Sequence, residues 1–370
     1  MDFDVTSFLD SLQKAVDICT EYDVIPHVAD EHHQYLVICD NAFGLCDCTI
    51  NSVFCRYTDF SEFIPHNLLN YLLLIAPNTT TFWNYRRQSL LTSSDAKELA
   101  NAEIKFTQLI LSRYPRSNET ILYRQWIVEK CNYLQDDEFL LNELKLCNRI
   151  ADKYRCNYGL WQYRRFLLSH AIPQIYDIEL KHMNDWLEKH PTDTSGWSYL
   201  FTVLNSLLNH SVLTSTSNSS SSSSLSTSTL LNNQLQLESV KDILKRYFEK
   251  VHNILKLYPE RESVWTFRRQ LVTLWLQLHQ NHIHENRDIE NIHSLLNEVE
   301  PLSPKSLNII NKLKASYDKL FHGLSFNEFL SWSHKNNLCK EPSSLKWVDL
   351  LLLRYLFWLS ERITDLYIIQ

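Results

Sequence analysis

Glycine is scarce in this sequence, and proline is not abundant. The 370 residues include four glycines and ten prolines. Tight hairpin turns depend on glycine, so a mainly β fold would have little material for its turns. Hydrophobic residues make up 44% of the chain, which is enough for a large core. A leucine-rich chain with so little glycine favours helices.

An excess of basic residues is also absent. The formal net charge is −7 at pH 7, whereas proteins that bind nucleic acid generally present a basic surface. We therefore expect no nucleic-acid partner. The first residues, MDFDVTSFLD, lack the basic start and apolar run of a signal peptide. This predicts a cytoplasmic protein whose cysteines are reduced.

The sequence contains no well-spaced set of metal ligands. Its nine cysteines include no CxxC pair, although Cys46 and Cys48 follow His27 within one segment. The other candidates nearby are His32, His33, Cys39 and Cys55. Such residues build zinc sites, but buried free cysteines are common. We expect no metal ion on this chain, with a zinc site in this segment as the alternative.

A long uncharged hydrophobic run is missing as well. The most apolar stretch, from Trp347 to Ile369, carries Asp349, Arg354, Glu361 and Arg362. Charged side chains are costly in lipid. We therefore expect a terminal core helix here and no membrane span.

What the sequence does contain is a repeat. Its pattern is a proline, a tryptophan six residues later, an aromatic residue two positions after that, and then an arginine pair. The five copies are PNTTTFWNYRRQSLL from Pro77, PRSNETILYRQWIV from Pro115, RCNYGLWQYRRFLL from Arg155, PTDTSGWSYLFTVL from Pro191 and PERESVWTFRRQLV from Pro259. Ile121 replaces the tryptophan in the second copy, and Leu200 replaces the first arginine in the fourth. A period of 36 to 40 residues separates the first four copies, and a Ser-rich tract lengthens the last interval.

Each copy predicts a pair of helices. An apolar run forms the first helix, proline ends it, and polar linker residues such as Ser117 and Asp193 cap the second. The signature residues on the second helices are Trp83, Arg86, Arg87, Trp161, Arg164, Arg165, Trp197, Trp265, Arg268 and Arg269. Stacked helical pairs bury aromatic side chains between neighbours. We expect the first arginine of each pair to be structural, with a partner surface as the alternative.

This unit resembles the repeat of protein prenyltransferase alpha subunits. NYGLWQYRRFLL, from Asn157 to Leu168, is similar to that family's Asn-Tyr-x-x-Trp-x-His-Arg-x-Trp element. The resemblance covers about residues 67–276, and the flanks match only a variant branch of the family. The tetratricopeptide repeat has a similar period, but its Trp, Gly-Tyr and Ala-Phe landmarks are absent.

The resemblance implies an all-α fold, a right-handed α-α superhelix built as a crescent of stacked helical hairpins. We expect a divergent N-terminal region at 1–60, then prenyltransferase alpha-type repeats at 61–300 and a C-terminal helical cap at 301–370. A disordered Ser-rich insertion is expected at 211–232. Residues from Gln34 onward are expected to form one or two short strands or an irregular arm, packed against the first repeat or against substrate.

The resemblance also implies a function. In that family the beta subunit holds zinc, with magnesium as a further ion, together with the substrate cysteine and the isoprenoid pocket. By analogy this chain is the alpha subunit of a heterodimeric protein geranylgeranyltransferase, binds no cofactor itself and is inactive alone. Its partners would be a Rab-type beta subunit, a protein substrate with a C-terminal cysteine, and geranylgeranyl diphosphate held by the beta subunit. The alternative is a noncatalytic helical-repeat adaptor.

Alpha subunits of the family also lend polar groups to the departing diphosphate. Asn157 and Tyr158 match an Asn-Tyr-His run, with Gly159 in place of the histidine, and Arg116 takes the position of a lysine. The diphosphate-binding candidates implied by the resemblance are therefore Arg116, Asn157 and Tyr158. No residue of this chain is expected to be catalytic.

Overall fold

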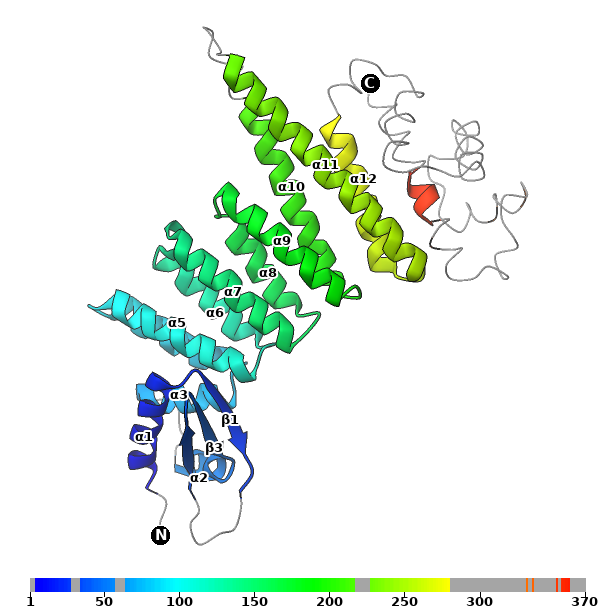
Figure 1. Cartoon of the computed structure of the whole chain (residues 1–370). Coiled ribbons are helices and arrows are strands. Elements are labelled where there is room, and N and C mark those ends of the chain that lie inside the picture. Colours follow the sequence, from blue (N-terminus) through cyan, green and yellow to red (C-terminus); the bar gives the residue numbers. More distant parts are fainter. Residues whose placement is uncertain are drawn as a thin grey trace. The chain divides into compact units, whose positions relative to one another are not determined.

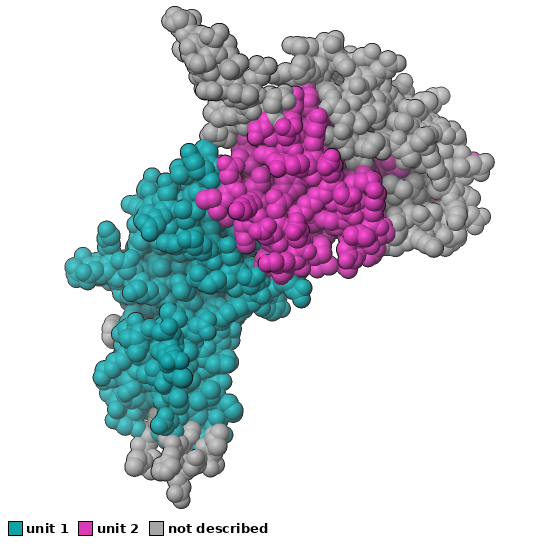
Figure 2. All heavy atoms as spheres, in the orientation of Figure 1, with its two compact units in different colours: residues 1–175 teal, residues 176–370 magenta. Residues whose placement is uncertain are grey.

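The computed structural model describes residues 4–27, 34–56, 64–216 and 227–279, together with 331, 335, 351 and 354–359. The chain forms two compact units, Met1–Ile175 and Tyr176–Gln370, which Figure 2 colours separately. Figure 1 labels the helices and strands within them.

The first unit opens with a small α/β layer. Helix α1 (Val5–Ile18) leads into strands β1 (Glu21–Ile25), β2 (Leu36–Cys39) and β3 (Ala42–Cys46), and helix α2 (Cys48–Arg56) follows. The strand order is β1-β3-β2, with β3 parallel to β1 and antiparallel to β2. Of the alternatives expected after Gln34, one or two short strands or an irregular arm, the structure has two strands, β2 and β3. Strand β1 was not predicted.

This N-terminal layer packs on the first helices of the repeats. Helix α1 contacts α3 (His66–Ile75) and α5 (Ala96–Arg113), and β1 also contacts α5. The Tyr22 hydroxyl donates to the Leu74 carbonyl over 2.8 Å. The apolar residues of the N-terminal region therefore cover the first repeat, which was one of the two partners expected for them.

Paired helices make up most of the remaining described chain. The pairs are α3 with α4 (Thr80–Thr92), α5 with α6 (Asn118–Lys130), α7 (Asp137–Lys153) with α8 (Tyr158–Leu168), α9 (Pro173–Lys189) with α10 (Thr194–Thr216), and α11 (Thr227–Leu257) with α12 (Glu262–Leu278). A short 3₁₀ helix, η1 (Tyr133–Gln135), joins α6 to α7. Within the first unit α5 to α8 lie side by side, as Figure 1 shows. The predicted all-α helical-repeat fold is confirmed.

Polar side chains begin the second helices. Ser117 accepts a hydrogen bond from the backbone N–H of Thr120 over 3.4 Å, and Asp193 accepts one from Gly196 over 3.0 Å. Each cap satisfies a backbone donor that the first helical turn leaves unpaired. The caps predicted at Ser117 and Asp193 are therefore confirmed.

The prediction of a disordered Ser-rich insertion over 211–232 is wrong at both ends of the segment. Helix α10 continues to Thr216 and α11 begins at Thr227, so helix occupies both flanks of the predicted 211–232 segment. Once a helix is nucleated, each further residue adds a hydrogen bond at little cost, which lets polar residues extend an existing helix. Residues 217–226 lie outside the described residues.

Few residues of the predicted C-terminal cap are described. Among them, Tyr355 places its ring 5.6 Å from that of Trp265, and Arg354 pairs with Glu262 over 3.5 Å. This segment thus packs on α12, the last helix of the repeats. Most of the apolar stretch 347–369 lies outside the described residues. Among the helices that are described, none combines the length and apolar character that a membrane crossing requires.

Candidate functional site

A hydrogen bond explains the six-residue spacing from proline to tryptophan. The indole N–H groups donate to the proline carbonyls over 2.7 to 2.9 Å, in the pairs Trp83–Pro77, Trp197–Pro191 and Trp265–Pro259. Each of these prolines lies two residues beyond the end of the first helix, so its carbonyl has no partner within that helix. The indole of the second helix supplies the partner, and these three tryptophans therefore clamp the two helices of their hairpins together.

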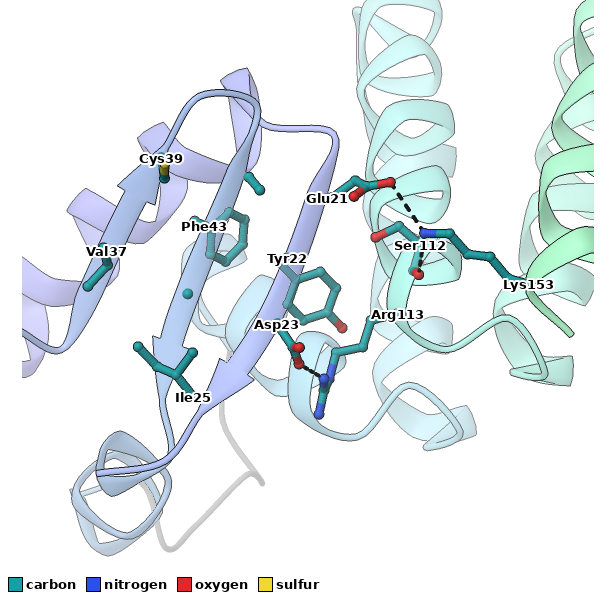
Figure 3. A pocket seen from close by; sticks show the side chains of 12 residues that line it. Glu21, Tyr22, Asp23, Ile25, Val37, Cys39, Phe43, Ser112, Arg113 and Lys153 are labelled. Carbon is teal, nitrogen blue, oxygen red and sulfur yellow. Dashed lines mark hydrogen bonds and ion pairs between the residues drawn. The ribbon is translucent and has the colours of Figure 1, made fainter. Parts of the chain in front are cut away.

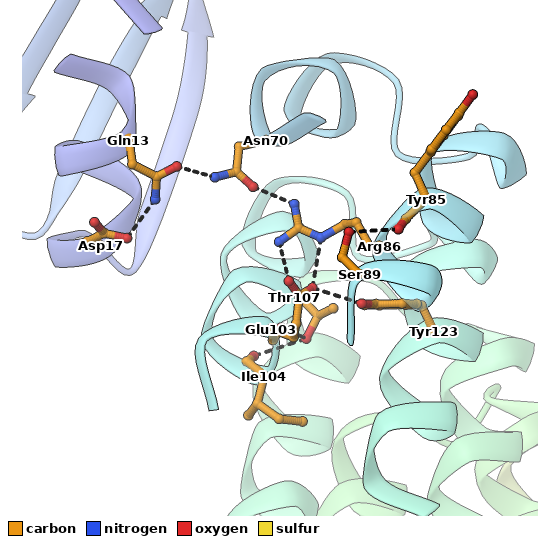
Figure 4. Close-up of polar contacts among 10 residues, drawn as sticks. All are labelled: Gln13, Asp17, Asn70, Tyr85, Arg86, Ser89, Glu103, Ile104, Thr107 and Tyr123. Carbon is orange, nitrogen blue, oxygen red and sulfur yellow. Dashed lines mark hydrogen bonds and ion pairs between the residues drawn. The ribbon is translucent and has the colours of Figure 1, made fainter. Parts of the chain in front are cut away.

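The first arginine of the signature lies inside the fold. Arg86 is buried and donates two hydrogen bonds to the Glu103 carboxylate, from Nε over 2.8 Å and from Nη2 over 2.6 Å. Its third donor reaches the Asn70 side chain, and the Tyr123 hydroxyl donates to Glu103 over 3.0 Å (Figure 4). A bidentate pair of this kind is strong and geometrically specific. The arginine, glutamate and tyrosine together form what we call an Arg–Glu–Tyr cluster.

A second Arg–Glu–Tyr cluster follows one repeat later. Arg124 donates to the Glu143 carboxylate from Nε over 2.7 Å and from Nη2 over 2.5 Å, and the Tyr163 hydroxyl donates to Glu143 over 2.7 Å. Arg124 was not among the predicted signature residues, since Ile121 replaces the tryptophan in that copy. The Tyr-Arg step shared by the first three copies was the signal that could have identified it.

The glutamates were missed as well. Glu103, Glu143 and Glu179 each accept a hydrogen bond from the tyrosine twenty residues later, and the third of these bonds, from Tyr199, is 2.5 Å long. Each glutamate lies on the first helix of a hairpin and its tyrosine on the second. A single acidic residue in an amphipathic helix is normally predicted to be solvent-exposed. The only sequence signal for these glutamates is therefore the repeated spacing of twenty residues between glutamate and tyrosine.

Burial decides the protonation of these clusters. It raises the pKa of Tyr123 and Tyr163, and the neighbouring glutamate carboxylates raise it further. Both tyrosines therefore remain protonated and act as donors. Burial by itself lowers the pKa of Arg124, but the Glu143 carboxylate outweighs this effect and the pKa rises overall. The guanidinium stays charged inside the protein.

The last hairpins replace the cluster as a whole. Leu200 stands at the arginine position, Tyr247 at the glutamate position and Phe267 at the tyrosine position, and all three are buried. The rings of Tyr247 and Phe267 meet edge to face, 6.3 Å apart. A buried carboxylate that has lost its arginine is strongly destabilising. The three positions therefore change together, and Leu200 does not show that the other arginines are dispensable.

The other first arginines also contact the protein itself. Arg164 is buried and donates to Asn148 over 2.5 Å. Arg268 is half-buried, with its guanidinium 5.3 Å from the ring centre of Tyr355. Both contacts fit the structural role expected for the first arginines.

In the first and third copies, the second arginine of the signature is more accessible than the first. Arg87, Arg165 and Arg269 are all half-buried. Arg87 donates to Asn84 over 2.7 Å, within its own helix. Arg87 and Arg165 are better placed than the buried Arg86 and Arg164 to contribute to a partner surface, whereas Arg268 and Arg269 are equally half-buried.

Both polar atoms of the Asn157 side chain form hydrogen bonds within the protein. Its Oδ1 accepts from the backbone N–H of Leu160 over 3.3 Å, and its Nδ2 donates to the Pro115 carbonyl over 2.5 Å. It therefore caps α8 and ties two loops together. At Gly159, where the family has histidine, an added Cβ would lie 2.4 Å from Oδ1 of Asn118, an exposed side chain that would have to move.

Arg116 and Tyr158 lie at the surface. Arg116 donates to the Tyr154 hydroxyl over 2.7 Å and stacks 4.6 Å from the centre of its ring. Tyr158, the first residue of α8, is 68% exposed. The bond between Asn157 and Pro115 joins the loops that carry them. We call Arg116, Tyr154 and Tyr158 the loop rim; a guanidinium and two phenols there suit an anionic or protein ligand.

A pocket of ≈ 560 Å³ opens between the N-terminal sheet and the ends of α5 and α7 (Figure 3). Phe43 is part of its apolar lining. Lys153 pairs with Glu21 over 3.3 Å, and Arg113 pairs with Asp23. Since these pairs join the sheet to the repeats, the pocket is part of the joint between them.

One group of side chains within the described residues is close enough to share a metal ion. It consists of His27, Cys46 and Cys48. The sequence analysis expected no metal on this chain and kept a zinc site in this segment as the alternative.

Comparisons with known proteins agree with the repeat. Residues 140–171 and 176–207 match the family "Protein prenyltransferase alpha subunit repeat", and these ranges correspond to the hairpins α7–α8 and α9–α10. Over 243 residues the chain is 24% identical to the Homo sapiens "Protein prenyltransferase alpha subunit repeat-containing protein 1", which covers 57% of this chain and 58% of that protein. The Danio rerio protein of the same name is 25% identical over 243 residues, covering 57% of this chain and 55% of that protein. The chain thus spans little more than half the length of these relatives.

Two enzyme subunits are also similar. "Geranylgeranyl transferase type-2 subunit alpha" of Dictyostelium discoideum is 29% identical over 115 residues, which is 29% of this chain and 35% of that protein. The Homo sapiens protein of that name is 26% identical over 211 residues, which is 55% of this chain and 33% of that protein. The helical hairpins, their repeated signature and these similarities together show that the chain carries protein prenyltransferase alpha subunit repeats and is akin to the proteins built from them.

Proposed function

We propose that this chain is the alpha subunit of a heterodimeric protein geranylgeranyltransferase and pairs with a Rab-type beta subunit. The observation that carries the proposal is the loop rim on a scaffold of alpha-subunit repeats. The Arg–Glu–Tyr clusters occupy the interior of the hairpins, while Arg116 and Tyr158 are left at the surface. The similarity to geranylgeranyl transferase type-2 alpha subunits supports the choice of partner.

The two subunits would divide the work. The beta subunit would hold zinc, with magnesium as a further ion, and the geranylgeranyl diphosphate, so this chain would be inactive alone. The substrate is a protein with a C-terminal cysteine, whose thiolate displaces the diphosphate from the isoprenoid. Arg116 would offer positive charge and Tyr158 a hydroxyl donor to that leaving group. Cytoplasmic action would suit the free cysteines of the described residues.

Reconstitution tests the proposal. The chain is purified alone, with a Rab-type beta subunit and with a farnesyl-type beta subunit, and each sample receives labelled geranylgeranyl or farnesyl diphosphate and a protein ending in a cysteine motif. We expect geranylgeranyl transfer only from the pair with the Rab-type beta subunit. Turnover by the chain alone, or transfer only with the farnesyl-type partner, would contradict the proposal.

Charge reversal on the rim refines this test. Arg116→Glu should reduce transfer by at least about tenfold, which corresponds to roughly 1.4 kcal/mol of transition-state stabilisation. Arg149→Glu is the matched control, since Arg149 is also an exposed arginine of the first unit but lies outside the loop rim. Equal activity of both variants would remove Arg116 from the diphosphate site.

A second function, a noncatalytic helical-repeat adaptor, is favoured by one set of observations. Asn157 is committed to the fold, and Gly159 replaces the family's histidine. An adaptor needs neither residue for chemistry. A complex with either beta subunit that transfers no isoprenoid, or no complex with either one, would favour the adaptor over the enzyme subunit.

A further inference from the structure

We propose that His27, Cys46 and Cys48 bind one zinc ion at the edge of the N-terminal sheet. This goes beyond the proposed function, in which the zinc used for catalysis belongs to the beta subunit. The site would be structural, and it lies in the N-terminal layer, away from the loop rim.

Parallel strand pairing brings the three residues together. Strands β1 and β3 run parallel with Ile25 opposite Cys46, so their carboxyl ends meet at one edge of the sheet. His27 lies two residues beyond β1, Cys46 is the last residue of β3, and Cys48 is the first residue of α2. Ligands of open sheets that contain parallel strands generally bind outside the carboxyl ends of the strands.

The distances suit a small ion. One ligand atom from each of the three residues lies within 4.8 Å of the others. The sulfurs of Cys46 and Cys48 are 2.9 Å apart. Two thiolates on a tetrahedral zinc, with bonds of about 2.3 Å, lie about 3.7 Å apart, so the sulfurs would have to separate by less than about 1 Å. Side-chain rotation can provide this movement.

Asp47 holds the two ligand segments together. Its backbone N–H donates to the Ile25 carbonyl over 2.9 Å, and its Oδ1 accepts from the backbone N–H of His27 over 2.8 Å. On the other side, the Thr49 hydroxyl donates to the Cys46 carbonyl over 2.6 Å. The backbone that carries the ligands is therefore fixed without a metal, which reduces the entropy lost when one binds.

Burial and chemistry favour zinc over other ions. Cys46 is buried, Cys48 is half-buried and His27 is exposed, so an ion would have a protein side and a solvent side. Zinc takes four ligands, which leaves one position for water or another donor. Thiolate and imidazole suit zinc, whereas magnesium and calcium prefer oxygen ligands.

The alternative chemistry for the two cysteines is a disulfide between them. Such a bridge would consume both thiols and exclude a metal. Reduced cysteines were predicted because the first residues lack a signal-peptide pattern. A metal ion was not expected because no CxxC pair occurs, and β1, which brings His27 alongside, was not predicted. Cys39 is an exposed free thiol on β2, and His32 and His33 lie outside the described residues.

Metal analysis of the full chain tests the site. The protein is purified with a reductant and without a chelator, and its metal is measured by mass spectrometry. We expect one zinc per chain in the wild type and at least a tenfold weaker zinc affinity in His27→Gln and Cys48→Ser. Cys39→Ser is the matched control and should bind zinc like the wild type. Neither His27 nor Cys48 is buried, so these variants should fold, which circular dichroism checks.

Two further readouts distinguish the outcomes. Cobalt in place of zinc should give a thiolate charge-transfer band in the near ultraviolet, and Cys48→Ser should lose about half of its intensity. A chelator should lower the unfolding temperature of the wild type and leave that of His27→Gln unchanged. The proposal is overturned if the reduced chain takes up no zinc from a zinc-containing buffer, or if Cys39→Ser loses as much as Cys48→Ser. A Cys46–Cys48 disulfide in the reductant-purified chain would also overturn it.

Discussion

A buried arginine is stable in these repeats because of the residues around it. Arg124 is 1% exposed, yet Glu143 takes two of its hydrogen bonds and Tyr163 supplies a third donor to the same carboxylate. Removing both charges from water is costly, and only the pairing and the added hydrogen bonds offset that cost. At the residue scale the cluster behaves as one unit, as the joint replacement by Leu200, Tyr247 and Phe267 indicates.

Removing the arginine alone should therefore be severe. Arg124→Leu leaves the Glu143 carboxylate buried without its cation, and we expect a loss of about 3–5 kcal/mol in the free energy of unfolding. The triple variant Arg124→Leu/Glu143→Leu/Tyr163→Phe removes every charged group of the cluster and should be more stable than the single variant. Urea denaturation measures both. A triple variant less stable than the single one would show that the cluster is not a unit.

The buried tyrosines predict how stability depends on pH. Burial raises the pKa of Tyr123 and Tyr163 in the folded chain, whereas in the unfolded chain both ionise near pH 10. Above that pH the unfolded state binds fewer protons, so the free energy of unfolding falls as pH rises. Each tyrosine should contribute roughly 1 kcal/mol per pH unit to this slope. The stability is fully present below pH 10.

Urea denaturation between pH 9 and 11 checks this slope. Tyr123→Phe/Tyr163→Phe should show a clearly shallower fall than the wild type, because neither position can ionise. Tyr158→Phe is the control at an exposed position and should keep the wild-type slope. Identical slopes for the double variant and the wild type would contradict the assignment.

At the scale of the element, the loops between helices form hydrogen bonds that hold neighbouring hairpins together. The Pro77 carbonyl accepts from the indole of Trp83 within its own hairpin and from the Ser117 hydroxyl of the next, over 2.7 and 3.3 Å. Asn157 makes the equivalent bond to Pro115 one repeat later. These two loops are thus tied to the caps of the hairpins that follow them, which fixes how those hairpins stack.

The adjacent residues Asn157 and Tyr158 have different roles, because Asn157 links the loops and Tyr158 is exposed. Asn157→Ala removes a cap and an inter-loop bond, and we expect it to lower the free energy of unfolding by about 1–2 kcal/mol. Tyr158→Ala removes an exposed side chain and should change stability by less than about 0.5 kcal/mol. Thermal unfolding of the two variants gives the comparison. A neutral Asn157→Ala would mean that the cap has little importance.

The helices were predictable because their signals are local. Apolar periodicity, proline after the first helix and caps such as Ser117 all act over a few residues. Strand β1 was missed because its partner β3 lies about twenty residues further along, and pairing at that range leaves no local pattern. The glutamates Glu103 and Glu143 were missed for the same reason, since their arginines and tyrosines lie on other helices.

The candidate site was predicted only in part. The resemblance supplied Arg116, Asn157 and Tyr158 as a set, and the structure leaves Arg116 and Tyr158 at the surface while Asn157 holds the loops together. Tyr154 was not predicted as part of this site, and its hydrogen bond with Arg116 in the structure places it in the loop rim. Exposure and hydrogen-bond partners depend on tertiary structure, so sequence spacing could not separate these roles.

At the scale of the whole molecule, interior and surface have different tasks. The clusters and tryptophan clamps account for the signature within the hairpins, and the loop rim carries groups that the fold does not need. The proposed alpha subunit would use this division, because it would present a binding face without being a catalyst itself. The proposed zinc site lies in the N-terminal layer, so a negative result for zinc binding would leave the proposed beta-subunit partner untouched.

Affinity for a Rab-type beta subunit tests this account most directly. Titration calorimetry with the purified chain measures it for the wild type, for Arg116→Glu/Tyr158→Ala and for the control Arg149→Glu. We predict a one-to-one complex, a dissociation constant at least about tenfold higher for the rim variant, which is about 1.4 kcal/mol, and no change for the control. No complex with the wild type, or a rim variant that binds as tightly as the wild type, would contradict the account.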